Sequence, residues 1–139
     1  MKRKIMYSVG VIAILILGIV IGVYATNYQK NKTLDRAFEQ GAKTVDSIKE
    51  GKSEEIYKNA LSDYTETNTQ DSFTQAVAPF TNSALKNGEA TLYSDNSGGY
   101  VFIQEYTNDK SEFQGQLTVS ILTNDDGTLV VSNIVPSLN

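Results

Sequence analysis

The chain of 139 residues contains no cysteine and no histidine. Without cysteine, it can form no disulfide bond, thiol nucleophile or thiolate metal site. Without histidine, it lacks the side chain that most often serves as a general base and as a ligand for zinc, copper or iron. These two absences argue against most hydrolases and metalloenzymes. We therefore expect no catalytic residue, no metal site and no cofactor, and a protein that is not an enzyme.

Basic residues are scarce in the second half of the chain. Beyond Asn59 only Lys86 and Lys110 are basic, against ten carboxylates. The sixteen acidic residues all follow the N-terminal hydrophobic run, together with nine of the twelve basic ones, so this part has a net charge near −7. Such a surface repels phosphate backbones, and we expect no nucleic-acid partner.

The longest uncharged run is Ile5 to Ala25, 21 residues dominated by Ile, Val, Leu, Gly and Ala. As a helix it would extend about 30 Å, the thickness of the hydrocarbon core of a bilayer. Lys2, Arg3 and Lys4 precede it, and basic flanks favour the cytoplasmic side. The sequence thus predicts a single-pass plasma-membrane protein with a cytoplasmic N-terminus (1–4), a transmembrane anchor (5–25), a juxtamembrane segment (26–33) and an extracytoplasmic domain (34–139).

A cleaved signal peptide is the alternative for the same run. Val23-Tyr24-Ala25 offers a small-x-small cleavage site. The apolar core of a signal peptide usually has about 7–15 residues, and this run is longer. Its length therefore favours an anchor over a cleaved signal.

Helical periodicity marks the first part of the domain, which is large enough to bury one hydrophobic core. Leu34, Phe38, Val45 and Ile48 share one face of an amphipathic helix, and Gly51 is expected to end it.

A second helix is expected to have Ser53 as its N-cap and to bury one apolar stripe, made of Ile56, Tyr57, Ala60, Leu61 and Tyr64. The polar run Thr65 to Gln70 is expected to be a loop. Asp71 then caps a short third helix, which Pro79 ends.

From the turn signal Asn87-Gly88 onward, the pattern becomes alternating. Short links rich in Asn, Asp, Ser and Gly separate four runs, so the strands should pair as antiparallel neighbours. The fold class is therefore α+β, with two or three helices packed on a four-stranded antiparallel sheet. The predicted strands are Ala90–Ser94, Tyr100–Thr107, Gln116–Thr123 and Thr128–Val135.

Alternation also predicts which side chains share a face, because successive residues of a strand point to opposite sides. In the second strand, one face carries Val101, Ile103 and Glu105, and the other carries Tyr100, Phe102, Gln104 and Tyr106. In the third strand, Leu117, Val119 and Ile121 share the face expected to meet the helices.

Three stretches carry a family resemblance: IKEGKSEEIYKNALSDYTE, TQDSFTQAVAPF and LTVSILTNDDGTLVVSNIVP. In this order they resemble the NTF2-like (cystatin-like) superfamily, especially its small membrane-anchored extracytoplasmic members, over Leu34 to Pro136. The resemblance implies a long and a short helix wrapped on a curved sheet, closed by a last strand after an Asp-Gly turn. Leu129 stands where the family often has Trp. The family includes isomerases, dehydratases, ligand carriers and scaffolding domains, so the resemblance fixes no activity.

Enzymes of that superfamily use a pocket between helices and sheet, lined by tyrosine with an acidic residue or histidine. The resemblance implies a candidate pocket made of Tyr57, Tyr64, Tyr106 and Glu105. A buried carboxylate beside a tyrosine could move protons next to a carbonyl group. No diagnostic spacing links these residues, however, and amphipathic aromatics usually serve in packing. We expect packing rather than catalysis.

The cluster Asn124-Asp125-Asp126-Gly127 resembles part of a calcium loop. An EF-hand would need an acidic residue where Leu122 stands, and a later Glu that is missing at the required distance. Turn formation explains the cluster without a metal.

Three functions fit these features. We expect a non-catalytic binding or assembly module, anchored in the membrane, with a protein partner in the cell envelope. A pilin-like structural subunit is the alternative, because it too has a helix leading from the membrane into a four-stranded sheet; the hydrophobic run lacks the Gly-Phe processing site and the early Glu of pilins. An NTF2-like pocket for a small apolar ligand is the third.

The predicted topology can be tested with protease. Added to intact cells or spheroplasts, it should remove the C-terminal domain, because Lys2, Arg3 and Lys4 stay inside. Immunoblotting measures the loss. Protection of the domain until the cells are lysed would contradict the orientation, and a soluble product beginning at Thr26 would identify a cleaved signal.

Overall fold

The computed structural model describes residues 29–60, 62–81, 84–95 and 97–139. The chain divides into two compact units, Met1–Asp35 and Arg36–Asn139. In the first, residues 29–35 are described and are helical. No helix among the described residues is long and apolar enough to cross a membrane. The predicted anchor, Ile5 to Ala25, lies outside the described residues, as do Leu61 and Asn96.

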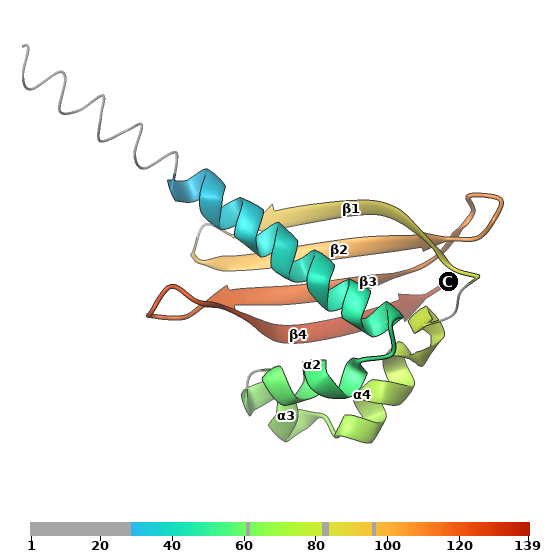
Figure 1. The fold of residues 1–139 in the computed structure, drawn as a ribbon, viewed down its shortest axis with the longest axis horizontal. Helices are drawn as coiled ribbons and strands as arrows, with labels where there is room; N and C mark the ends of the chain where they lie inside the picture. The colour runs from blue at the N-terminus through green and yellow to red at the C-terminus, as the bar shows by residue number, and fades with distance from the viewer. Residues whose placement is uncertain (1–28, 61, 82–83, 96) are drawn as a thin grey trace, which may run out of the picture. The chain divides into compact units, whose positions relative to one another are not determined.

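A four-stranded antiparallel sheet forms the centre of the second unit (Figure 1). Its strands pair in chain order, so the predicted meander and the α+β class are confirmed. The first three strands begin earlier than predicted and end where predicted, whereas the last begins one residue later and ends three residues later. They are β1 (Lys86–Ser94), β2 (Gly99–Thr107), β3 (Phe113–Thr123) and β4 (Leu129–Leu138).

The predicted turn at Asn87-Gly88 is wrong, because both residues lie within β1. The register of β1 against β2 shifts between Asn87 and Ala90, which marks a β-bulge or irregularity. The buried side chain of Gln104 donates to three carbonyl oxygens, those of Gly88 (3.3 Å), Glu89 (3.3 Å) and its own neighbour Glu105 (2.9 Å). A side-chain amide from β2 thus holds the irregular part of β1 in the sheet.

The hydrophobic core lies between one face of the sheet and the helices. In β3, Leu117, Val119 and Ile121 are fully buried, as the alternation predicts. In β2, Phe102 and Tyr106 are fully buried on the same face. β4 adds Val131 and Ile134, and the helices supply the other core residues, which are Val45, Ile48, Tyr64, Phe73, Val77 and Phe80.

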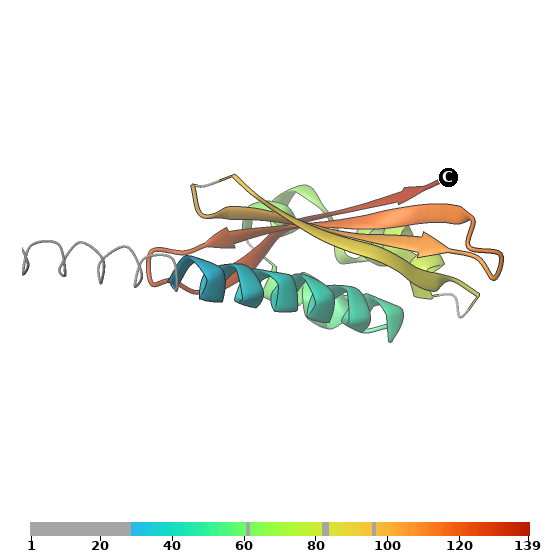
Figure 2. The ribbon, with the colours of Figure 1, turned by 90° about the horizontal axis from the view of Figure 1, so that it is seen from above.

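A long helix crosses this face of the sheet, and residues 36–49 are its part in the second unit. Figure 2 shows the helix lying along one side of the sheet. Gly51 ends it as predicted, with φ +78°. The amide of Gly51 donates to Ile48 O (2.9 Å) and that of Lys52 to Ser47 O (2.8 Å), which is the hydrogen-bond pattern of a Schellman motif.

The predicted second helix is two helices, α2 (Ser53–Asn59) and α3 (Ser62–Thr67). Ala60 interrupts the helical path, because its backbone is extended (φ −72°, ψ 162°). Ser53 is not the N-cap either: Lys52 holds that position, and Ser53 is the first helical residue. The buried Ser53 hydroxyl lies 3.4 Å from the hydroxyl of Thr74.

The polar run from Thr65 to Gln70, predicted as a loop, is helical except at Asn68 and Thr69. Helix α4 (Gln70–Val77) follows α3 after two residues, and a short 3-10 helix, η1 (Ala78–Thr81), continues it through Pro79. Thr69, and not Asp71, caps α4, because its hydroxyl accepts from the amide of Ser72 (3.2 Å). Loop composition alone does not reveal such closely spaced short helices.

The two faces of β3 should respond differently to the same substitution. Val119→Asp places a carboxylate in the sealed core and should lower the free energy of unfolding by several kcal/mol. Thr118→Asp, on the other face and half-buried, should cost far less. Thermal melting of the two purified variants measures the difference, and equal losses would contradict the assignment of the faces.

Candidate functional site

Two of the four candidate pocket residues meet in an aromatic cluster. The rings of Tyr57, Tyr64 and Phe73 lie with centroids 5.9–6.5 Å apart. The Tyr57 hydroxyl donates to the carbonyl oxygens of Thr65 (3.2 Å) and Asn68. Burial raises the pKa of Tyr64, and the neighbouring Tyr57 adds to the shift. This cluster joins α2, α3 and α4 through packing and hydrogen bonds.

Tyr106 is fully buried in the core, with its ring centroid 5.1 Å from that of Phe80. Burial, with a smaller contribution from the charge of Asp46, raises the pKa of Tyr106 to about 12. Its hydroxyl has no hydrogen-bond partner among the described residues. Tyr106 therefore stays a neutral phenol at physiological pH and serves as a large core side chain.

Glu105 lies on the other face of the sheet. It follows Gln104 and precedes Tyr106, both buried on the helix side, and it pairs with Gln116 across β2 and β3. Successive side chains of a strand point to opposite faces. The sheet thus separates Glu105 from the tyrosines, and the four candidate residues do not form one pocket.

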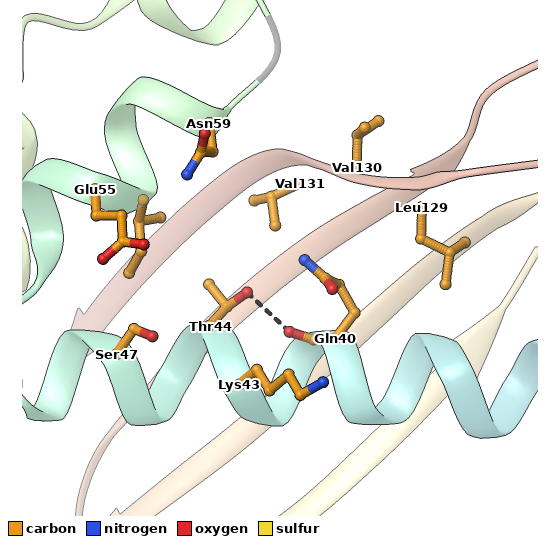
Figure 3. Close-up of a pocket in the computed structure, with 10 residues that line it drawn as sticks. Gln40, Lys43, Thr44, Ser47, Glu55, Asn59, Leu129, Val130 and Val131 are labelled. Atoms are coloured by element: carbon orange, nitrogen blue, oxygen red, sulfur yellow. Dashed lines mark hydrogen bonds between the residues drawn. The ribbon is translucent and has the colours of Figure 1, made fainter.

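A groove of about 370 Å³ lies elsewhere, between the long helix, α2 and the start of β4. The side of the groove formed by the long helix is polar and consists of Gln40, Lys43, Thr44 and Ser47, which span two helical turns (Figure 3). The Thr44 hydroxyl donates to the backbone oxygen of Gln40 (2.8 Å). The side chain of Gln40 extends over the groove, as Figure 3 shows.

The other walls combine apolar and polar side chains. Leu129 and Val131 of β4 point toward the groove, whereas Val130 points away from it (Figure 3). Glu55 and Asn59 come from α2. An apolar floor with polar side chains along its sides, two of them charged, can bind a partner by contact and hydrogen bonds.

The groove continues toward the turn that joins β3 to β4. A second hollow of about 330 Å³ shares Gln40, Lys43 and Leu129 with it and adds Arg36 and Thr128. Lys43 forms an ion pair with Glu39 (2.8 Å) at this rim, and both side chains are well exposed. The pKa of Glu39 is lowered by the hydrogen bond that Glu39 accepts from Lys43 and by the charge of Lys43. Charges of both signs thus stand at the outer end of the groove.

The turn after β3 has the structure that its sequence predicts. Gly127 has φ +80°, and its amide donates to Asn124 O (2.8 Å). Asp126 accepts from the hydroxyl (2.6 Å) and the amide (2.9 Å) of Thr128, and these bonds lower its pKa. Within the described part of the chain, no three acidic residues lie close enough together to hold a metal ion.

Sequence reasoning missed the groove. One signal was present: Gln40, Thr44 and Ser47 form a neutral polar row at helical spacing, next to the apolar stripe. The other walls come from α2 and β4, which are distant in sequence. Only the packing of the helix on the sheet brings these parts together.

The buried hydroxyl of Tyr106 leads to a prediction about stability. Tyr106→Phe removes a buried polar group without a partner, so stability should stay the same or rise by about 1–2 kcal/mol. Tyr57→Phe loses hydrogen bonds to two carbonyl oxygens and should destabilise by about 1 kcal/mol. Urea unfolding measures both, and a loss at Tyr106 as large as that at Tyr57 would show that its hydroxyl has a partner.

Comparison with known proteins assigns no family to the chain. No protein-family model matches its sequence. No curated protein matches it either.

Proposed function

We propose that this protein is a non-catalytic binding or assembly module, held at the extracytoplasmic face of the plasma membrane by the predicted anchor Ile5 to Ala25. The observation that carries the proposal is the groove between the long helix, α2 and β4. It combines the apolar surface of Leu129 and Val131 with polar side chains of the long helix and α2. In this proposal a protein of the cell envelope binds there.

The domain itself is proposed to be NTF2-like. The support is architectural: helices pack on one face of a four-stranded antiparallel meander, and the last strand follows the turn at Asp126-Gly127. A groove between helices and sheet also fits the place where that superfamily binds ligands. Fold resemblance of this kind says where a partner would bind and nothing about which partner.

The geometry of the tyrosines supports a non-catalytic role. A proton-transfer site needs an acid and a base within hydrogen-bond reach of one substrate. Glu105 is separated from Tyr64 and Tyr106 by the sheet, and the raised pKa values of both tyrosines keep them protonated. In the groove, Glu55 and Lys43 stand on different helices, with neutral side chains around them.

A small ligand is the second candidate, and the size of the groove favours it. Sites for small molecules usually enclose about 300–1,000 Å³, and this groove measures about 370 Å³. Leu129 and Val131 provide the apolar contact such a ligand would need. A protein partner remains preferred, because polar and charged side chains at the rim suit a polypeptide surface better than an apolar molecule.

The groove can be tested by affinity capture of the full-length protein from its own membranes. Asn59→Trp should fill the groove from α2 and weaken capture of the partner about tenfold, equivalent to 1.4 kcal/mol. Lys58→Trp is the matched control, since it places the same side chain on the neighbouring exposed position, outside the groove lining. Quantitative mass spectrometry of the captured proteins measures the ratio.

Capture at the wild-type level by Asn59→Trp would contradict the groove as the docking site. The small-ligand candidate is separated by a thermal-shift screen against lipids, steroids and cell-wall fragments. A ligand at a hundredfold excess over its dissociation constant stabilises the folded state by about 2.7 kcal/mol. A clear shift that Asn59→Trp abolishes and Lys58→Trp preserves would replace the protein partner with a small ligand at the same site.

A further inference from the structure

The face of the sheet turned away from the long helix carries apolar side chains that stay partly exposed among the described residues of the second unit. We call it the open face and define it by its six apolar residues: Tyr93, Val101, Ile103, Leu122, Val130 and Val135. Tyr93, Leu122 and Val135 have 58%, 43% and 48% of their surface exposed. An antiparallel sheet with one solvated face normally has polar side chains there. On this sheet the solvated face carries large apolar side chains as well as polar ones.

Cross-strand pairing shows how these residues are arranged. One row runs across the four strands as Thr91, Ile103, Thr118 and Val135, and the next as Tyr93, Val101, Ser120 and Asn133. Neither row contains a charged side chain, although the chain as a whole is acidic. Beside them lies a mostly apolar hollow of about 330 Å³, with Tyr93, Val101 and Leu122 in its lining. The centre of the open face is thus neutral, and apolar residues alternate there with small polar ones.

The free edge of the sheet at β1 is a poorer contact site. The register irregularity between Asn87 and Ala90 interrupts its outer row of backbone groups, and Lys86 stands at its beginning. Irregularities and lysines are the features that keep edge strands from pairing with another chain. Association through the sheet is therefore favoured across its face rather than along this edge.

We propose that the open face binds the open face of a second copy of this chain, so that two sheets stack into a symmetric dimer. A twofold axis brings each patch against its own copy, so the patch must be complementary to itself. A neutral centre meets that requirement, because like charges do not face each other across it. The two central rows carry no acidic group, and Glu105 lies in the row beside them, next to Gln116 and Ser137, at one end of the contact area.

The size of the open face suits a dimer of moderate affinity. Four strands about 4.8 Å apart and eight residues at about 3.4 Å each cover roughly 500 Å². Two such faces bury roughly 1,000 Å², which is near the lower limit of specific interfaces. Half-exposed Val, Ile, Leu and Tyr side chains give this area an apolar core.

The natural absence of cysteine makes cross-linking a direct test. Two variants of the full-length chain are made, Thr118→Cys and Ser120→Cys, each with one cysteine in the centre of the open face. Each variant is kept in the cell fraction in which the protein is found. A bis-maleimide whose reach matches the sheet spacing of about 10 Å is then added. We expect both variants to give a covalent homodimer. Asp71→Cys, exposed on α4, is the control and should remain monomeric.

Lysine substitutions then test whether the contact is specific. In the Thr118→Cys background, Val135→Lys should lower the dimer yield about tenfold, equivalent to 1.4 kcal/mol. Leu138→Lys is the matched control: Leu138 is equally exposed on the same strand but pairs with the buried Gly115, on the helix side. It should leave the yield unchanged. Melting curves at low concentration verify that both lysine variants fold.

Three outcomes would overturn the proposal. The first is the absence of a homodimer with both central cysteines. The second is an equal yield with Asp71→Cys or with Val135→Lys. The third is capture of a different protein by the central cysteines, which would make the open face a site for that partner. None of these results depends on the groove, so they leave the proposed function to its own test.

Discussion

The close approach of the long helix to the sheet at Gly41 determines how the rest of the second unit packs. A Cβ atom at this position would lie 2.3 Å from Cγ of Phe102, and no real Cβ atom is found that close to another heavy atom. The helix backbone therefore rests directly on the Phe102 ring. One turn earlier, Phe38 packs edge-on against the same ring, with centroids 5.1 Å apart. Glycine here permits an approach that alanine would prevent.

The remaining contacts of the helix follow from this approach. With the helix so close to β2, Val45 and Ile48 reach the core and are 1% and 0% exposed. The adjacent side of the helix carries Gln40, Thr44 and Ser47. These residues line the groove between the helix, α2 and the start of β4. The groove is thus a consequence of where the helix touches the sheet. Its polar wall is the flank of the helix beside the side that rests on Phe102.

The meander was predictable because it depends on local patterns. Alternation has a period of two residues, so Leu117, Val119 and Ile121 had to share a face wherever the strand was placed. Gly51 was equally predictable as a helix end, because the left-handed conformation there favours glycine. These features are determined by the backbone and by the residues next to them.

Other features depend on contacts between distant residues, and these could not be predicted. The stripe from Ile56 to Tyr64 is compatible with one helix, yet the chain breaks at Ala60 and the Tyr57 hydroxyl bonds to carbonyl oxygens of Thr65 and Asn68. The first residues of β1 have poor strand propensity, and Gln104 from β2 holds them. The groove joins three elements, so no single stretch of sequence contains its pattern.

The groove and the open face lie on opposite sides of the sheet, and this separation has a functional consequence. Val131 points into the groove, whereas its neighbour Val130 points away from it and belongs to the open face (Figure 3). A dimer joined through the open faces would therefore leave both grooves accessible, one on each outer side. Two grooves that are rigidly linked bind a partner with repeated sites more tightly than one groove does, because the second contact becomes intramolecular. If the protein is a binding module, such a dimer would give it avidity without a larger binding surface.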